Sequence, residues 1–373
     1  MNYDKCRIGY VVANLKRVGP TNQTLNIIRY SGAIENCVVI TLFDEPEDTQ
    51  IQEYYQQGIK VLCLHLSQKT VLIKGVSLLT ETLRNENVQL VHSYGTFADI
   101  AATHACRRLN IEHIITLRNF PMEDMTTRMN RLVGTIGAMV VLHYLKRCKN
   151  VICCSRSIET KMKETYHWNN LHSIQNGVDF TKFTSHDKNQ VRRELGVDEQ
   201  TLVFISTGSM IPRKRIDETV DAFIAGKPSE KAELWLLGDG ILLDELKAKY
   251  ADEKNVKFLG KQSQVARYLS AADVFVSSSE SEGMPNSVLE AIACGLPVYL
   301  SDIPQHLEVF DNIPGCGKAY SLGRRDMMAE LFRNTAYDDI QVMHCCAEKI
   351  SDSDLTMMKM GGKYAKFYEV ISV

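Results

Sequence analysis

Short runs of apolar and β-branched residues recur along the whole chain, and amphipathic stretches separate them. Buried parallel strands carry such near-continuous apolar runs, and helical crossovers must connect them. This rhythm predicts an α/β fold built on parallel sheets. The expected strands are residues 7–12, 37–42, 60–66, 90–94, 113–118, 150–155, 202–208, 232–238, 256–260, 273–279 and 296–301.

These strands form two series of five or six, which indicates two doubly wound domains. A length of 373 residues also exceeds what one hydrophobic core usually serves. The Asn-Gly pair at 176–177 predicts a tight turn between the series. We therefore expect domains at 1–175 and 176–354. Residues 355–373 are expected to return to the first domain, as a helix interrupted at the Gly-Gly pair 361–362.

Composition narrows the class of protein. Hydrophobic residues make up 45% and charged residues 24% of the chain, as in ordinary globular proteins. A formal net charge of −2 argues against a nucleic-acid partner. The first residues lack the apolar region of a secretion signal, and no segment reaches the roughly 20 apolar residues of a spanning helix. We expect a cytoplasmic protein.

The chain has eleven cysteines, and none has the CxxC spacing of a zinc or redox site. The adjacent pairs at 153–154 and 345–346 lie in apolar surroundings. Small buried hydrophobic side chains in a reducing compartment are therefore the expected role of these pairs, rather than metal ligation.

The most informative stretch is residues 277–304, SSSESEGMPNSVLEAIACGLPVYLSDIP. It predicts a buried strand, a polar loop and a helix that begins near Pro285, where proline is tolerated. Ligands of open α/β folds usually bind at such a helix start, at the carboxyl edge of the sheet. The free N–H groups there favour an anion such as a diphosphate.

Two carboxylates flank this helix start, Glu282 in the loop and Glu290 in the helix. A diphosphate would repel them, so each is expected to accept hydrogen bonds from sugar hydroxyls, and a ribose diol suits one carboxylate well. The alternative is that both glutamates only cap or solvate the helix, which is the common role of isolated glutamates.

A basic loop follows the expected strand that ends at Gly208, with Arg213 and Lys214 before the next helix. Cations here can stabilise charge that grows on a leaving diphosphate. The alternative is a solvated basic turn. No Asp-x-Asp pair accompanies these motifs at the end of an expected strand, so these cations and helix N–H groups are expected to replace a metal ion.

Glycines follow two other strands. Gly238 and Gly240 in LLGDGILLDEL permit close backbone approach, but the full dinucleotide fingerprint is absent. The first strand is followed by NLKRVGPTNQ and not by a Gly-x-Gly-x-x-Gly loop, which disfavours a nicotinamide dehydrogenase.

Taken in order, these motifs resemble the C-terminal domain of the family 4 retaining glycosyltransferases, also described as glycosyl transferases group 1. Seven residues separate Glu282 from Glu290, as in the paired-glutamate motif of that family. IQNGVDFTKF at 174–183 looks like its interdomain segment, and VGPTNQTLNI at 18–27 looks like its glycine loop. The resemblance covers nearly the whole chain. It implies the GT-B fold, in which two Rossmann-like domains face each other, with the acceptor side N-terminal and the nucleotide-sugar site C-terminal.

The resemblance also implies roles for individual residues. Glu290 would hold the ribose, Glu282 the donor sugar and Lys214 the diphosphate, while Gly19 would let the opposing domain approach. The reaction would retain the anomeric configuration and need no metal or other cofactor. The implied donor-binding residues are Gly19, Ser209, Gly238, Lys261, Gly283, Met284, Asn286 and Glu290.

The sequence departs from the family pattern at two places. Ser209 stands where many members have arginine, and Arg213 is the candidate to supply that charge. Arg118 and Asn119 stand about where many members have a catalytic-site histidine, in a run similar to enzymes that build bacterial surface polysaccharides, such as capsule and lipopolysaccharide. The implied catalytic residues are therefore Lys214, Arg213, Glu282 and Arg118, and the acceptor-side residues are His92 and Asn119. For His92, a satisfied structural histidine is an equal alternative.

The predicted function is transfer of a sugar from a nucleotide sugar, expected to be a UDP-sugar, to a glycan or lipid-linked acceptor. Two alternatives stay open. A nucleotide-sugar epimerase or hydrolase of the same fold would release free sugar without an acceptor. A non-catalytic sugar-binding homologue, with Ser209 and Arg118 marking an inactive site, would not turn over a donor.

Residues 126–150 join basic ends to an apolar middle that is too short to span a bilayer. One interpretation is a helix on the cytoplasmic membrane surface, with its basic ends on anionic headgroups. The other is a helix packed on its own sheet, where Gly134 and Gly137 allow close contact. The basic residues are Arg128, Arg131, Lys146, Arg147 and Lys149.

Overall fold

The computed structural model describes residues 6–371, without the side chain of Arg128. The chain divides into two compact units, residues 1–176 with 357–373, and residues 177–356. The boundaries expected from the sequence differ from this division by one or two residues at each joint.

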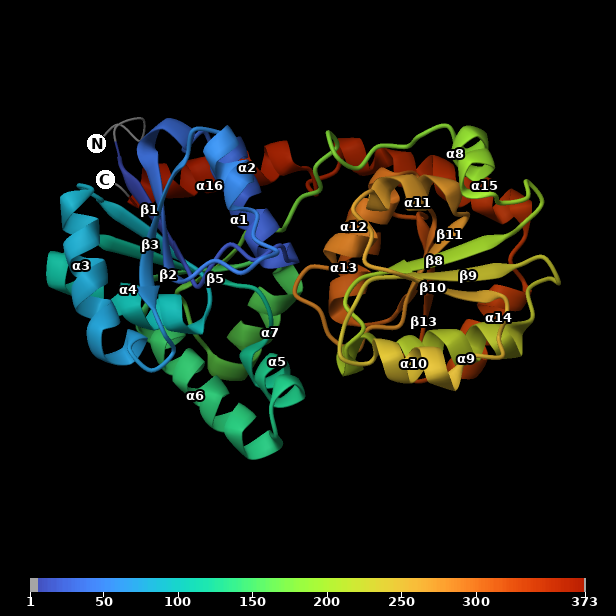
Figure 1. The fold of residues 1–373 in the computed structure, drawn as a ribbon, viewed down its shortest axis with the longest axis horizontal. Coiled ribbons are helices and arrows are strands. Elements are labelled where there is room, and N and C mark those ends of the chain that lie inside the picture. The colour runs from blue at the N-terminus through green and yellow to red at the C-terminus, as the bar shows by residue number, and fades with distance from the viewer. Residues whose placement is uncertain (1–5, 372–373) are drawn as a thin grey trace. The chain divides into compact units, whose positions relative to one another are not determined.

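The first unit is a seven-stranded parallel sheet of order β3-β2-β1-β4-β5-β6-β7, with helices on both faces (Figure 1). The strand order reverses between β1 and β4, where doubly wound folds bind their ligands. Its strands are β1 (Ile8–Val12), β2 (Cys37–Phe43), β3 (Lys60–Leu66), β4 (Leu90–Ser93), β5 (Glu112–Leu117), β6 (Asn150–Cys153) and β7 (Leu171–Ser173). Its helices are α1 (Gly19–Tyr30), η2 (Ile34–Asn36), α2 (Ile51–Gln56), η3 (Val71–Gly75), α3 (Val76–Asn85), α4 (Thr96–Leu109), α5 (Pro121–Arg128), α6 (Arg131–Arg147), α7 (Arg156–Tyr166) and α16 (Met357–Ile371).

The second unit is a six-stranded parallel sheet of order β10-β9-β8-β11-β12-β13. Its order reverses between β8 and β11. Its strands are β8 (Val203–Thr207), β9 (Glu233–Leu237), β10 (Val256–Gly260), β11 (Val274–Ser277), β12 (Val298–Ser301) and β13 (Gly317–Tyr320). Its helices are α8 (Lys188–Leu195), η4 (Pro212–Lys214), α9 (Ile216–Gly226), α10 (Leu243–Lys249), α11 (Val265–Ala271), α12 (Asn286–Ala293), α13 (Pro304–Asn312), α14 (Arg325–Arg333), α15 (Tyr337–Ala347) and η5 (Glu348–Asp352).

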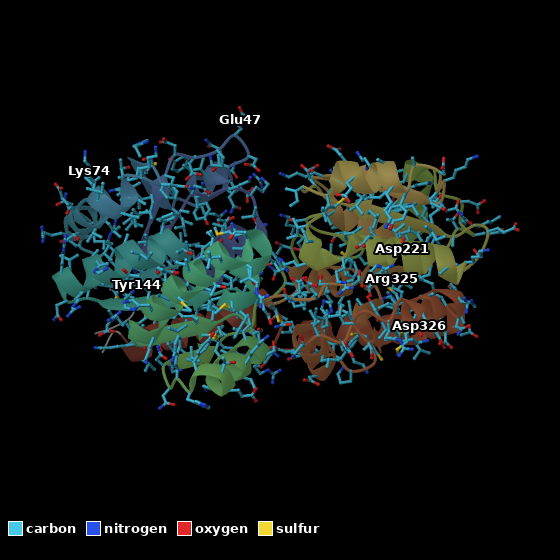
Figure 2. All side chains as sticks on the ribbon, turned by 90° about the horizontal axis from the view of Figure 1, so that it is seen from below. Glu47, Lys74, Tyr144, Asp221, Arg325 and Asp326 are labelled. Carbon is cyan, nitrogen blue, oxygen red and sulfur yellow. The ribbon has the colours of Figure 1, made fainter. Side chains whose placement is uncertain are left out.

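Each sheet is buried between layers of helices. Along β1, Tyr10 packs into one core with α1 and α16, and its neighbour Val11 packs into the core on the opposite face. In the second unit, Phe204 of β8 packs against α9 and α14. Asp221 of α9 and Arg325 of α14 then form an ion pair at 3.0 Å, and Figure 2 shows them side by side.

The expected α/β class with two parallel sheets is confirmed, and all eleven expected strands form with ends within two residues of those predicted. The sequence did not reveal β7 and β13, which lie at the edges of their sheets. Each is only three or four residues long, LHS and GKAY, and neither has the apolar run that marks a buried strand.

The expected break at Gly361 is wrong, because α16 runs through it without interruption. A Cβ atom at Gly361 would lie 2.3 Å from the carbonyl carbon of Tyr30. The glycine therefore lets α16 pack directly against the end of α1, and the two helices lie side by side at the first unit in Figure 1.

The expected turn at residues 176–177 is also wrong. Gly177 has no positive φ, and residues 174–177 form neither a turn nor other regular secondary structure after β7. Val178 pairs in parallel with Thr356, and its N–H donates to the carbonyl of Leu355 at 2.9 Å. The two segments at the division between the units thus run together as neighbouring extended chains.

The two pairs of adjacent cysteines differ in how deeply their side chains are buried. Cys153 and Cys154 are buried, as expected, but Cys345 is exposed and Cys346 only partly buried. The second pair lies on the amphipathic helix α15, which buries Ile340, Met343 and Ala347 instead. The expectation of burial fails at this pair because the helix turns it outward.

Candidate active site

The residues singled out in the second half of the sequence lie on loops that follow neighbouring strands of the second unit. Gly208 and Ser209 follow β8, the segment 238–240 follows β9, and Lys261 follows β10. The loop 278–285 follows β11 and leads into α12. Because all strands of the sheet are parallel, these loops share its carboxyl edge, on both sides of the point where the strand order reverses.

The glycines after β9 allow two loops to touch. A Cβ atom at Gly238 would lie 1.8 Å from the carbonyl oxygen of Gly208, and one at Gly240 would lie 2.4 Å from that of Met210. Both glycines also have positive φ values, 141° and 159°. Contact between loops accounts for these glycines, so a donor-binding role for Gly238 rests on the resemblance alone.

The loop that follows β8 is bound to the loop that follows β11. The N–H of Glu280 donates to the carbonyl of Arg213 at 2.9 Å, and Ser278 Oγ donates to the carbonyl of Arg215 at 2.8 Å. Arg215 has a left-handed backbone, with φ 48°, and its guanidinium pairs with Glu218 at 2.6 Å. These bonds fix the basic loop at the edge of the sheet.

A buried carboxylate and two cations form the centre of this edge. The Lys214 ammonium and the Arg213 guanidinium both pair with Glu282, the latter at 3.0 Å. Arg213 also donates to the carbonyl of Ser281 at 2.6 Å. Burial alone would raise the pKa of Glu282, but the charges of Lys214 and Arg213 hold it down at about 2. The cluster therefore has two positive charges and one negative charge at neutral pH, which leaves it cationic.

Glu290 of α12 has a different environment. The carboxylate is partly buried, and within residues 6–371 the structure records no hydrogen bond or ion pair of its side chain. Burial raises the pKa of Glu290 to about 7, although the charges of Lys182 and Lys214 oppose that rise. A partly buried carboxylate without a partner is an open hydrogen-bond acceptor, which suits the hydroxyl groups of a ligand.

The remaining residues of the motif form the entry into α12. Gly283 and Met284 are buried in the loop, and the N–H of Asn286 donates to the carbonyl of Met284 at 2.9 Å. The helix begins at Asn286, one residue after the expected start at Pro285. Ser209 and Lys261 are exposed on the neighbouring loops.

Two further residues near the site were not singled out from the sequence. His306 of α13 is fully buried, its Nδ1 bonds to Ser301 Oγ at 3.0 Å, and its Nε2 has no hydrogen-bond partner among the described residues. Burial lowers its pKa to about 4, against the charge of Glu282. The second residue is Lys182, whose charge lowers the pKa of Glu290 against the effect of burial. Lys182 lies in the segment 174–183, whose resemblance to the interdomain motif could have singled it out.

In the first unit, Arg118 and Asn119 follow β5 at the carboxyl edge of the sheet. Arg118 donates to Asn176 Oδ1 at 3.1 Å and lies over the ring of Tyr94, 5.4 Å from its centroid. Asn119 donates to Asp124 at 3.1 Å. Both residues are partly exposed beside the start of α5. Gly19, also exposed, is the first residue of α1.

His92 lies in the core of the first unit. Its Nδ1 bonds to the Tyr368 hydroxyl at 2.8 Å, and its Nε2 bonds to the Thr116 hydroxyl at 2.5 Å. Burial lowers the pKa of His92 to about 3, with smaller effects of Arg118 and His113, so the ring is neutral. This geometry favours the structural alternative, because both ring nitrogens are already engaged.

The first two thirds of helix α6 expose large apolar side chains to solvent. Leu132 is 73% exposed and Ile136 55%. Near its start and middle the helix packs through small residues instead: a Cβ atom at Gly134 would lie 2.5 Å from the carbonyl oxygen of Met125 in α5, and Ala138 is fully buried, while Leu145 is buried near its end. The exposed apolar residues at this helix are Met129, Leu132, Val133, Ile136, Met139 and Val140.

Comparison with known protein families shows to which family the chain belongs. Residues 34–182 match Glycosyltransferase Family 4, and residues 199–329 match Glycosyl transferases group 1. Together the two matches cover about three quarters of the chain. The chain belongs to the family 4 glycosyltransferases. The paired glutamates and the basic loop lie within the second match.

Individual relatives agree with this assignment, and solved structures show the same fold. This chain is 26% identical over 318 residues to the O-antigen biosynthesis glycosyltransferase WclY of Escherichia coli. The match covers 82% of this chain and 83% of the relative. The chain is 28% identical over 261 residues to the UDP-Gal:alpha-D-GlcNAc-diphosphoundecaprenol alpha-1,3-galactosyltransferase of Escherichia coli, covering 66% and 65% of the two chains. Anabaena Alr3699/HepE in complex with UDP-glucose superposes with a TM-score of 0.84 at 18% identity, over 98% of this chain and 99% of that one. The fold is therefore GT-B.

Among the residues that the structure describes, no helix of this glycosyltransferase combines the length and the apolar character needed to cross a membrane.

Proposed function

We propose that this glycosyltransferase moves a sugar from a UDP-sugar to a glycan or lipid-linked acceptor in polysaccharide biosynthesis, with retention of the anomeric configuration and without a metal ion. The observation that carries the proposal is the pair of glutamates at the start of α12. Glu282 is ionised and held by two cations, whereas Glu290, eight residues later, is a partly buried acceptor with no hydrogen-bond partner in the described part of the chain. Both kinds of carboxylate are suited to bind sugar hydroxyls, one in the donor sugar and one in the ribose.

The cations beside Glu282 supply the electrostatics of the reaction. As the bond between the anomeric carbon and the donor phosphate breaks, negative charge grows on the leaving diphosphate. Lys214 and Arg213 hold one positive charge more than Glu282 neutralises, and fixed charges in a site shielded from water stabilise such a leaving group strongly. In the front-face reaction that the family resemblance implies, the acceptor oxygen bonds to the anomeric carbon on the face that the phosphate leaves. The acceptor proton moves to a phosphate oxygen, and the products are the glycoside and UDP.

The relatives support the donor and acceptor classes. One of them is named for transfer from UDP-Gal to a sugar linked through diphosphate to undecaprenol, and another for O-antigen biosynthesis. A solved neighbour was determined with UDP-glucose. For this chain, a UDP-sugar donor and a lipid-linked acceptor follow as proposals.

A transfer assay tests the proposal directly. Nucleotide sugars that raise the melting temperature of the protein are first selected, because a ligand that binds only the native state stabilises it. Each selected donor, labelled in its sugar, is then incubated with a sugar diphosphate of a polyprenol. We expect transfer with the same anomeric configuration in donor and product, read by nuclear magnetic resonance.

Other results of this assay support the competing functions. Release of free sugar at the same rate without acceptor would identify an epimerase or hydrolase. Donor binding without turnover of any donor and acceptor pair would identify a sugar-binding homologue. An inverted product would overturn the front-face reaction.

We further propose that α6 lies on an anionic membrane surface and brings the enzyme to its lipid-linked acceptor. The apolar side chains that a core helix would bury are exposed on α6, and exposed apolar patches of this kind indicate an interaction site. Arg131 begins the helix, and Lys146 and Arg147 end it, all three exposed. Basic residues beside an apolar face are typical of interfacial helices, whose charges bind anionic headgroups.

Co-sedimentation with liposomes tests the membrane proposal. We expect binding to vesicles that contain anionic lipid, weaker binding at high salt, and a loss of binding when Lys146, Arg147 and Lys149 are replaced by serine. Lys247→Ser is the matched control, because Lys247 is an exposed basic residue of α10 in the second unit. Equal recovery in the supernatant with anionic and with neutral vesicles would contradict the proposal.

A further inference from the structure

Three residues with metal-binding side chains gather at the carboxyl ends of β2 and β3 in the first unit. Asp44 directly follows β2, and Cys63 and His65 lie near the end of β3. His65 Nδ1 lies 2.5 Å from Asp44 Oδ1, and one donor atom from each of the three residues lies within 4.8 Å of the other two. The side chains of His65 and Asp44 are about three quarters exposed, and Cys63 is partly buried.

Local irregularity of the sheet brings these residues together. Thr41 pairs with Cys63 and Phe43 pairs with Leu66, so β3 contains one residue more than β2 between these pairs. This bulge falls at His65, whose φ is 51°, a left-handed conformation that few residues other than glycine adopt. The N–H of His65 donates to Cys63 Sγ at 3.4 Å. Bulges and unusual backbone conformations are frequent where a side chain must be directed to a particular place.

The donor set has a definite chemical preference. Thiolate, imidazole and carboxylate are the three ligand types of zinc, at roughly 2.0–2.3 Å from the metal. Magnesium and calcium require mostly oxygen ligands, of which the cluster offers only one carboxylate. Donor atoms of one tetrahedral zinc ion lie about 3.3–3.8 Å apart, so the three atoms need only small side-chain rotations to surround it. The side chains of Asp44 and His65 extend into solvent and can rotate once their hydrogen bond to each other is broken.

We propose that Asp44, Cys63 and His65 form a zinc site, with water at the fourth position. On binding, Cys63 loses its thiol proton to solvent and exchanges its hydrogen bond to the carbonyl of Phe43, 3.3 Å long, for a bond to the metal. The proton between His65 Nδ1 and Asp44 Oδ1 also goes to solvent, so that His65 binds through Nδ1 as a neutral imidazole with its proton on Nε2. The ion joins β2 to β3, the edge strand of the sheet, and so stabilises the edge of the first unit. The site lies in the first unit, whereas the paired glutamates and the basic loop lie in the second, and the role of the ion is structural.

Metal binding can be measured without reference to activity. The full-length protein, stripped of metal and kept reduced, is titrated with zinc in competition with a chromophoric chelator. We expect one zinc ion per chain, a rise in melting temperature on binding, and affinity at least tenfold lower in Cys63→Ser and in His65→Ala. Cobalt in place of zinc should show thiolate charge-transfer absorption in the near ultraviolet, and Cys63→Ser should abolish it.

Two further variants complete the test, one as a control and one at the third proposed ligand. Cys345→Ser removes an exposed thiol of the second unit and should leave zinc affinity unchanged. Asp44→Asn changes an exposed carboxylate, so we expect it to leave the fold intact and to weaken zinc binding as well. Zinc affinity that is the same in Cys63→Ser, His65→Ala and the unmodified protein would overturn the proposal, as would the absence of stoichiometric binding.

Discussion

The basic loop of the second unit and helix α6 of the first unit both reverse the usual distribution of side chains. At the basic loop, two cations and a carboxylate are largely withdrawn from water; on α6, large apolar side chains are exposed to it. The two regions differ in whether the protein itself offsets the unfavourable exposure or burial. Lys214 and Arg213 offset the buried charge of Glu282 within the protein, whereas nothing in the described chain covers the apolar residues of α6. Local rules of folding are broken most often at functional sites, and the uncompensated site is the one that requires an outside partner.

Removing the charge of Lys214 from the basic loop should have the largest effect of the changes proposed, because it leaves Glu282 with one cation fewer. We expect Lys214→Ala to lower turnover roughly a hundredfold or more, because a fixed charge beside a leaving group in a site shielded from water contributes strongly to the rate. Steady-state kinetics with the selected donor measures this, and Lys247→Ala, an exposed lysine of α10, serves as the control. Turnover within a factor of two of the unmodified enzyme would exclude Lys214 from the reaction.

Among the described residues, the carboxylate of Glu290, unlike that of Glu282, has no hydrogen-bond partner. Its replacement by alanine should abolish useful donor binding, since even one lost hydrogen bond to a charged group weakens affinity about 10- to 100-fold. Calorimetric titration with the donor measures the loss, and circular dichroism shows that the variant is folded. Donor affinity equal to that of the unmodified protein would remove Glu290 from the site.

The pKa of Glu290 adds a test without donor. Its folded-state pKa of about 7 lies above the ordinary value of 4.5, so the folded protein keeps a proton that the unfolded chain releases. The stability from this group is fully present below pH 4.5 and is lost as the pH rises through about 7. Glu290→Gln should remove this slope and give a larger free energy of unfolding at pH 8. Denaturant titrations at pH 5 and pH 8 measure it.

On α6, the comparison predicts that an apolar side chain can be removed without loss of stability. Ile136→Ser should change the free energy of unfolding by no more than about 0.5 kcal/mol, as at other exposed positions. It should lower binding to anionic liposomes about tenfold, because a buried isoleucine side chain contributes about 1.5–3 kcal/mol. A large destabilisation, or unchanged liposome binding, would mean that α6 is an ordinary part of the core.

Arg213→Ala should lower turnover less than Lys214→Ala does. Arg213→Ala should lower turnover about tenfold, because Lys214 still pairs with Glu282 and retains part of the stabilising charge. Ser209→Arg in the same variant should restore activity if Arg213 supplies the charge that the family places at that position. If Arg213→Ala is silent and Ser209→Arg is neutral, the compensation between these positions is refuted.

The smallest effect should come from removing metal ions. We expect chelator to change the rate of sugar transfer by less than about twofold, because cations of the protein stabilise the leaving group. The measurement is turnover before and after chelation. Loss of activity that manganese or magnesium restores would show that a metal ion performs this task.

The sequence predicted those features that depend on local patterns. Apolar runs located eleven strands, and the spacing of Glu282 and Glu290 located the edge of the sheet at which the loops gather. Features that depend on distant contacts were not predictable in the same way. Gly361 looked like a helix break because only the structure shows Tyr30 beside it. The face that α6 would bury was likewise undetermined, since the choice depends on the contact of Gly134 with Met125.

The return of α16 to the first unit has a consequence for the order in which the protein is made. The second unit is one continuous segment and can fold as soon as it leaves the ribosome, but the first unit needs both ends of the chain. The hydroxyls of Tyr10 and Tyr368, 3.1 Å apart, belong to residues separated by 358 positions. At translation rates of about 5–20 residues per second, that interval lasts between about 20 and 70 seconds. During that time the apolar side of β1 and α1 stays uncovered, so the domain whose synthesis starts first is the last to be completed.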